Sequence, residues 1–255
     1  MCLIAFAVNA HPEYPFVMLA NRDEFHERPT VPSQWWETPQ KTEILSGRDL
    51  QGGGTWMGIT RTGRLAALTN VRKPPAKPGN KSRGQLVVDA LESERPAALA
   101  LNDYRLFNLL IAQANPQGQW SVMCQNEYSR PQGLNQGIHT LSNASLNSAW
   151  PKSIALKLAL SHMLSQPLDA WETLAFSALG NTEQHPDDQL PNTGVPLAWE
   201  RMLSAACIVS PAYGTRSSTL LVADKTGLIT WQEQSHDTNG SENLRRVETF
   251  QLQWV

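Results

Sequence analysis

The sequence predicts an α+β fold in which antiparallel sheets are covered by helices. Most strand candidates come in pairs joined by short turns, as in β-hairpins, and hairpin strands run antiparallel. The helix candidates come in pairs between groups of strands, which disfavours a doubly wound parallel sheet. Neither a GxGxxG motif nor a P-loop is present. We expect a single domain, 1–255, because no linker-like boundary interrupts the 255 residues.

The N-terminal third begins with two apolar runs, Cys2–Val8 and 16–20, separated by a turn-like segment. They predict a hairpin whose strands are both largely buried. The prolines around Trp35-Trp36 predict an irregular loop with aromatic side chains to bury. The glycine run 52–54 predicts a turn, followed by a second hairpin that ends near residue 71.

The middle of the chain predicts a loop and then two pairs of helices. The lysine- and proline-rich segment 73–81 is typical of a solvated loop, and Ser82 is a candidate N-cap for the helix that follows. The helices are expected at residues 85–91, 95–101, 154–164 and 171–179. Further strands are expected at residues 107–112, 120–124, 138–141, 205–209, 217–223, 228–233 and 247–252.

Composition excludes several classes of protein. The net charge is −2 and no basic stripe occurs, so neither nucleic acid nor an anionic membrane is an expected partner. The apolar N-terminal run is far shorter than the ~18 residues of a membrane span, and it lacks the features of a signal peptide. The three cysteines, Cys2, Cys124 and Cys207, predict no disulfide framework and no CxxC zinc site. We therefore expect a cytoplasmic protein without stable membrane insertion, in which Cys124 and Cys207 are inert core residues.

Cys2 is the most informative residue of the chain. It directly follows the initiator methionine, and removal of that methionine would leave one residue with both a thiol and a free α-amine. An α-amine titrates near ~7.7 and a thiol near ~8.5, so the amine can serve as the base for the thiol, as in an N-terminal nucleophile. The alternative is a small apolar residue at the start of a strand, because cysteine is commonly buried.

Polar residues end three of the predicted strands. The segment 21–24, with the sequence NRDE, follows the second strand, and the hairpin brings it near Cys2. Asn70 and Asn143 end two later strands, where amide groups can hold a developing oxyanion. Asparagine is also frequent in turns wherever strands stop, so a structural role stays open for both.

Several motifs, in order and across nearly the whole chain, carry a family resemblance. They are MCLI at 1–4, NRDEF at 21–25 with RP at 28–29, GGGTWMG at 52–58, LTNVR at 68–72, SRG at 82–84, LSNA at 141–144 and YGTR at 213–216. With these motifs the chain resembles the NRDE family, also called the transport and Golgi organisation 2 family. That family is in turn similar to N-terminal nucleophile hydrolases of the penicillin V acylase and bile salt hydrolase type.

The resemblance implies a four-layer αββα sandwich and a set of site residues. Matched position by position, these residues are Cys2, Arg22 with Asp23, Asn70, Asn143 and Arg216. One local departure concerns the acid, because the hydrolases place their aspartate a few residues after the arginine, whereas Arg22 and Asp23 adjoin. Adjacent residues of an extended chain point opposite ways, so Glu24 is an alternative acid.

The resemblance leaves three functions open. Members of the family are implicated in moving haem to recipient proteins, which implies a haem-trafficking protein with haem as its ligand and haem-acceptor proteins as partners. Cys2, His26 and His139 are candidate axial ligands of the iron, with the Cys2 thiol as the metal-binding group. The first alternative is an N-terminal-cysteine amidohydrolase or thioesterase, in which Cys2 attacks a carbonyl. The second is an acyl-CoA or lipid carrier that uses the same cleft without chemistry.

Overall fold

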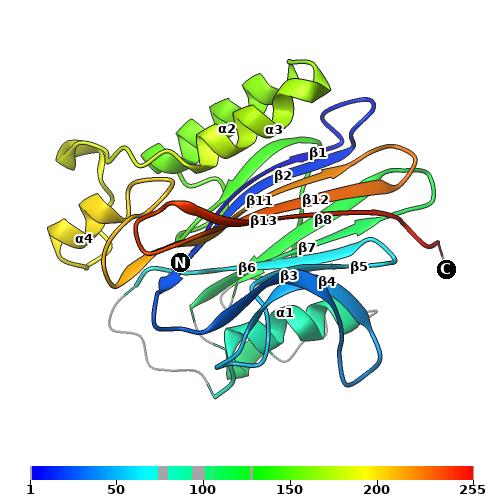
Figure 1. Cartoon of the computed structure of the whole chain (residues 1–255), viewed down its shortest axis with the longest axis horizontal. Helices are drawn as coiled ribbons and strands as arrows, with labels where there is room; N and C mark the ends of the chain where they lie inside the picture. Colours follow the sequence, from blue (N-terminus) through cyan, green and yellow to red (C-terminus); the bar gives the residue numbers. More distant parts are fainter. Residues whose placement is uncertain (1, 74–79, 94–100, 105, 127–128, 255) are drawn as a thin grey trace.

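The computed structural model describes residues 2–73, 80–93, 101–104, 106–126 and 129–254. Its elements form four layers, with two sheets stacked face to face between helices (Figure 1). Helices α2 (Pro151–Leu164) and α3 (Leu168–Leu179) cover one sheet, and α1 (Arg83–Glu92) covers the other. The predicted α+β fold and its αββα layering are confirmed.

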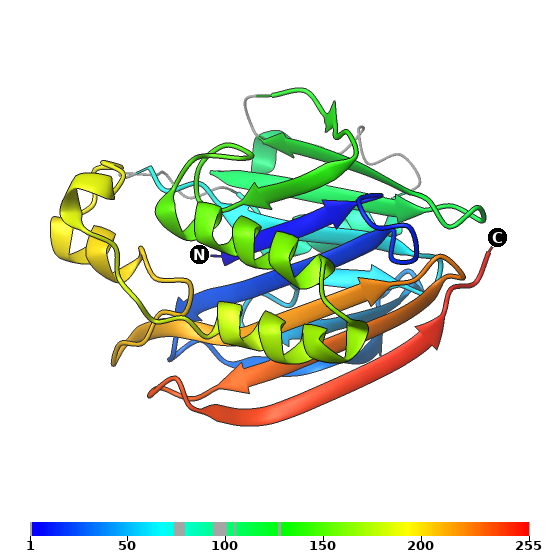
Figure 2. The same ribbon diagram turned by 90° about the horizontal axis from the view of Figure 1, so that it is seen from above.

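The first sheet has six antiparallel strands in the spatial order β10-β1-β2-β11-β12-β13. Figure 2 shows α2 and α3 lying across the outer face of this sheet. In chain order the strands are β1 (Cys2–Val8), β2 (Phe16–Phe25), β10 (Gly137–Leu141), β11 (Tyr213–Ala223), β12 (Leu228–His236) and β13 (Glu242–Gln251).

The second sheet has seven strands, in spatial order from β3 to β9. They are β3 (Thr30–Glu37), β4 (Glu43–Asp49), β5 (Met57–Thr60), β6 (Arg64–Asn70), β7 (Phe107–Ala114), β8 (Trp120–Asn126) and β9 (Gln132–Gly133). A short helix, α4 (Leu197–Met202), and two 3-10 turns, Leu101–Asp103 and Asp187–Gln189, complete the described elements. No helix within these ranges is long and apolar enough to cross a membrane.

Strand β1 shows why its sequence is a continuous apolar run. Ile4 and Phe6 belong to the core between the two sheets, whereas Leu3 and Ala5 pack in the cluster that includes α2 and α3. Both faces of the strand are therefore buried, and the alternation of side chains is invisible in the sequence. By the same alternation, Cys2 lies on the face shared by Ile4 and Phe6, between the sheets.

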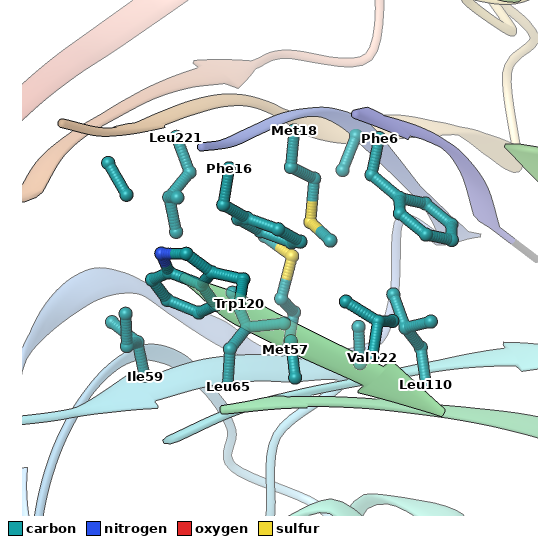
Figure 3. Close-up of a cluster of buried hydrophobic side chains, with 14 of the residues drawn as sticks. Phe6, Phe16, Met18, Met57, Ile59, Leu65, Leu110, Trp120, Val122 and Leu221 are labelled. Atoms are coloured by element: carbon teal, nitrogen blue, oxygen red, sulfur yellow. The ribbon is translucent and has the colours of Figure 1, made fainter. Parts of the chain in front are cut away.

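The core between the sheets is closely packed along most of its length. In Figure 3, residues of the first sheet meet residues of the second: Phe6, Phe16, Met18 and Leu221 against Met57, Ile59, Leu65, Leu110, Trp120 and Val122. The rings of Phe16 and Trp120 stack with their centroids 4.5 Å apart. Such a ring pair adds about 0.5–1.5 kcal/mol beyond its buried area, and its side chains fill the space between the sheets here.

Two sequence predictions are wrong. Trp35 and Trp36 lie in strand β3 rather than in a loop, because β3 is an edge strand where a proline is tolerated. The indole N–H of Trp36 also donates to Ser46 Oγ of β4 at 2.8 Å. Segment 205–209 is not a strand, because its backbone bonds elsewhere: the N–H of Ile208 donates to Thr215 Oγ1 at 2.8 Å.

Other predictions hold or fall outside the described part of the chain. Ser82 caps α1, since its Oγ accepts a hydrogen bond from Gly84 N. The hairpin of β1 and β2 forms as expected. Most of the loop predicted at 73–81 and nearly all of the helix predicted at 95–101 lie outside the described residues.

Candidate functional site

A cavity of about 740 Å³ opens between the sheets at the end where β1 begins. Strands β1, β2, β11 and β12 form one side of it, and β3, β4, β6 and the start of α1 form the other. Five of the residues singled out in the sequence line it together: Cys2, Arg22, Asp23, Asn70 and Arg216. Three others do not belong to its lining: Asn143, His26 and His139.

Cys2 lies at the start of β1 with 6% of its surface exposed, opposite Arg22 in the β1–β2 register. Burial raises the pKa of the Cys2 thiol to about 11; Asp23 adds to this rise and Arg22 opposes it. The thiol is therefore protonated at neutral pH and needs a base before it acts as a thiolate. Burial also raises the pKa of the Cys124 and Cys207 thiols, neither of which lines the cavity.

A β-bulge in β11 positions Arg216 at the cavity. The β11–β2 register shifts between Thr215 and Ser217, so Arg216 is the extra residue of the bulge. Its Nη1 donates to the carbonyl oxygens of Phe25 at 3.0 Å and Arg28 at 3.1 Å. Neutral carbonyls thus orient the guanidinium without cancelling its charge.

Asp23 and Lys152 form a buried pair of opposite charges beside the cavity. Asp23 is 1% exposed, and its Oδ1 accepts a hydrogen bond from the Thr215 hydroxyl at 2.7 Å. Burial raises the pKa of Asp23, and the Lys152 ammonium is the strongest influence in the other direction. Lys152 is 2% exposed, and burial lowers its pKa to about 8. Among the described residues, Lys152 Nζ has no hydrogen-bond partner, so Asp23 balances its charge through space.

Asn70 and Asn143 are joined to each other. Asn143 Nδ2 donates to the carbonyl oxygen of Asn70 at 2.9 Å, and the Asn143 carbonyl accepts from Arg72 N at 2.7 Å. Asn143 is 1% exposed. Its amide therefore ties the end of β6 to the chain after β10, while Asn70 is the one that lines the cavity.

An ion pair in the core joins this region to α4. Arg72 Nη1 lies 2.5 Å from Glu200 Oε2, and both side chains are 4% exposed. The Arg72 guanidinium also lies over the ring of Trp150, 4.7 Å from its centroid. The second carboxylate oxygen of Glu200 accepts hydrogen bonds from Thr193 N at 2.9 Å and Thr193 Oγ1 at 2.6 Å. These contacts fix α4 against the chain that follows Asn70.

The histidines named from the sequence lie away from Cys2. His26 contacts a backbone carbonyl through Nε2, and His139 stacks on Phe6 with 5.5 Å between ring centroids. Because His139 faces Phe6 in the β1–β10 register, it is four residues along from Cys2, roughly 13 Å at ~3.3 Å per residue. His236 lines the cavity instead, and burial lowers its pKa. The described residues contain no group of three His, Cys, Asp or Glu side chains that could hold a metal ion.

Sequence reasoning missed several residues in this region. Arg83 and His236 line the cavity itself, whereas Arg72, Lys152 and Glu200 line a second, much smaller pocket. One sequence feature could have pointed to Lys152. A lysine in the first turn of a helix is repelled by the helix dipole, which indicates that a nearby anion compensates its charge. Nothing in the sequence pairs Arg72 with Glu200, which is 128 positions away.

The layered fold is shared with solved structures of N-terminal nucleophile hydrolases, at low sequence identity. The chain superposes on an N-acylethanolamine-hydrolyzing acid amidase ortholog from Caenorhabditis elegans with a TM-score of 0.50 and 13% identity, over 87% of this chain and 92% of that one. It also superposes on a variant of the conjugated bile acid hydrolase from Clostridium perfringens with a TM-score of 0.53 and 9% identity, over 98% and 92% of the two chains.

Sequence similarity then identifies the family. The chain belongs to the Transport and Golgi organisation 2 family, whose sequence model matches residues 1–238. It is 33% identical to the human Transport and Golgi organization protein 2 homolog, over 99% of this chain and all of that protein. The mouse homolog is 32% identical over 92% of this chain and 93% of its own length. The Drosophila melanogaster protein is 25% identical over 97% and 98% of the two chains.

Proposed function

We propose that this chain binds haem in the cavity beside Cys2 and passes it to haem-acceptor proteins, on a scaffold shared with the N-terminal nucleophile hydrolases. The observation that carries the proposal is the combination of a roomy cavity with a buried thiol at its edge. A volume of about 740 Å³ falls within the ~300–1,000 Å³ of small-molecule sites. Val31, Pro32, Trp56 and Leu68 supply apolar wall against which a macrocycle can lie.

A protonated Cys2 thiol suits a protein that carries haem and then releases it. Thiolate sulfur is the form of cysteine that binds metal strongly, and burial keeps Cys2 protonated at neutral pH by raising its pKa to about 11. Bonding to iron would require loss of that proton, so the sulfur is a weak ligand. A weak axial bond favours release of haem to an acceptor that binds it more tightly.

The free thiols of the chain are those expected of a protein in a reducing compartment. Cys2, Cys124 and Cys207 are all free, and disulfide-free thiols persist where glutathione and thioredoxin keep them reduced. The cytoplasm is accordingly the location that we propose for this function, with haem-binding apoproteins as its partners.

A haemin titration followed by transfer tests the proposal. Purified protein is titrated with haemin while the absorbance is recorded, and the loaded protein is then mixed with an apo-globin. We expect one saturable site per chain and transfer within minutes. Cys2→Ala should move the absorbance maximum and weaken binding roughly tenfold, about 1.4 kcal/mol. Failure of the wild-type chain to bind haemin saturably, or to release it to the acceptor, contradicts the proposal.

The buried charges around Cys2 favour one second candidate, a cysteine amidohydrolase or thioesterase. Arg22 faces Cys2 across the strand pair, and the Asp23–Lys152 pair lies behind it. In this mechanism Cys2 Sγ attacks the acyl carbonyl, its proton passes to the free α-amine, and the amine or thiol of the substrate leaves with that proton. Water then releases the acid from the acyl-cysteine. Intact mass spectrometry is the test: loss of the initiator methionine, and an acyl adduct absent from Cys2→Ala, are the expected results.

A further inference from the structure

The cavity is positive although the chain as a whole is slightly acidic. The net charge of the protein is −2. Six cationic side chains line the cavity against four carboxylates: Arg22, Arg28, Arg48, Lys81, Arg83 and Arg216 against Asp23, Glu24, Asp49 and Glu233. Burial raises the pKa of Asp23 and Glu233, which disfavours their negative charge. A concave site lined by one sign of charge concentrates ligands of the opposite sign.

Arg83 stands out among these cations because of where it lies. It is the first residue of α1, and the first turn of that helix contains no acidic side chain. A cation at this end of a helix is repelled by the partial positive charge of the free backbone N–H groups. Arg83 is also partly buried, and burial lowers its pKa. The folded protein therefore holds a guanidinium where both the helix and desolvation disfavour it.

No carboxylate of the described residues forms an ion pair with Arg83. Two other cations of the cavity do form ion pairs: Arg28 pairs with Asp49 at 2.6 Å, and Lys81 pairs with Asp103 at 3.5 Å. Arg83 Nη1 donates a long hydrogen bond to the carbonyl oxygen of Leu106, at 3.4 Å. Glu24, which also lines the cavity, acts on Arg83 only through space, so the hydrogen-bond donors of the guanidinium remain available to a ligand.

The backbone around Arg83 is fixed by close packing. The glycine loop lies directly against the start of α1: a Cβ at Gly54 would come within 2.3 Å of the Gly84 carbonyl carbon. Thr55 N donates to the Gly84 carbonyl at 3.2 Å, which holds the two segments together. Cys2 is near enough to influence the pKa of Arg83. Arg83 therefore projects from a rigid wall into the space that Cys2 also borders.

We propose that Arg83 binds an anionic group, a carboxylate or phosphate, of the ligand that occupies the cavity. The proposal rests on the function given above, in which a small molecule lies beside Cys2. In haem the group is a propionate, and in an acyl-thioester or amide substrate it is a phosphate or carboxylate at the end remote from the reacting bond. Guanidinium binds such groups through two parallel hydrogen bonds.

Metal-free protoporphyrin IX and its dimethyl ester test the proposal, because the ester has the same ring without the two negative charges. Binding is followed by quenching of tryptophan fluorescence. Arg83→Gln should weaken binding of the free acid ~10- to 100-fold, the effect of one partly buried charge-assisted contact, and should leave binding of the ester unchanged. Arg201→Gln removes the same charge from an exposed pair with Asp187 and should change neither. Unchanged affinity of Arg83→Gln for the free acid, or equal loss for acid and ester, overturns the proposal.

A third probe, decanoate, separates this proposal from the function on which it rests. If the wild-type chain binds neither haemin nor the porphyrins but binds decanoate, and Arg83→Gln loses that binding, the anion site stands and haem binding fails. If haemin and the porphyrin acid bind and Arg83→Gln affects neither, haem binding stands and the anion site fails. If neither haemin nor any other anionic probe binds, both fail.

Discussion

The substitution Glu200→Gln removes the charge from the buried ion pair while preserving the shape of the side chain. Arg72 and Glu200 are each 4% exposed and 2.5 Å apart, so the substitution leaves a guanidinium in the core without a counter-charge. Breaking a buried pair in this way costs about 3–5 kcal/mol, a large part of the ~5–15 kcal/mol that stabilises a typical domain. The amide oxygen can still accept from Thr193 and the Trp150 ring still faces Arg72, so we expect a loss near the lower bound, about 3 kcal/mol.

Urea unfolding followed by tryptophan fluorescence measures this loss. With a slope of about 3 kcal/mol per molar urea, the midpoint should fall by about 1 M without a change of slope. Asp187→Asn is the matched control, because it breaks an arginine–carboxylate pair of the neighbouring Arg201, at 2.6 Å, whose side chains are both about half exposed. The control should unfold like the wild type. A Glu200→Gln midpoint that also matches the wild type would refute the reasoning that burial makes this pair matter.

Three further predictions concern the cavity and its surroundings. Alkylation of Cys2 by iodoacetamide should be slow at pH 7.5 and rise toward pH 11, because burial raises the pKa of the thiol to about 11; half-maximal rate near pH 8.5 would contradict this. Gly54→Ala should lower the urea midpoint, because its Cβ would clash with the Gly84 backbone, whereas Gly133→Ala, with nothing within 4 Å, should not; equal midpoints would contradict the clash. The pKa of Lys152 falls from 10.5 to about 8 on folding, so the unfolded chain binds more protons between these values and Lys152 makes stability rise with pH there. Relative to Lys152→Met, the wild type should gain stability from pH 8 to 10.5; parallel pH profiles would contradict this.

Periodicity and turn residues predict most of the fold, because they report local geometry and burial. The hairpin of β1 and β2, the cap at Ser82 and the helices α2 and α3 all follow from such patterns. Burial alone does not distinguish a strand from an irregular buried segment, which explains why the strand predicted at 205–209 is wrong. Ala205 and Cys207 are buried like strand residues, but their segment bonds to β11 at Ile208 through the Thr215 side chain as well as its backbone, not through a regular ladder. At Trp35 the sequence predicts a loop where the structure has strand β3, because the nearby prolines suggest a loop but are also compatible with an edge strand.

The site was predictable only where the sequence carries short motifs. The NRDE segment and the strand-end Asn70 led to the cavity, since a hairpin and a strand end fix their positions relative to Cys2. Lys152 and Glu200 could not be found in this way, because their partners, Asp23 and Arg72, are brought near only by tertiary packing. The bulge that positions Arg216 is likewise a property of the sheet register.

A cavity-filling substitution tests most directly whether the space beside Cys2 holds haem. Ser235 lines the cavity from β12, and Ser235→Trp would occupy part of its volume while every charged residue of the lining is kept. Ser121→Trp adds the same bulk at an exposed position on β8. The account predicts at least tenfold weaker haemin binding for Ser235→Trp and wild-type binding for Ser121→Trp. Wild-type haemin affinity in a folded Ser235→Trp protein would contradict it.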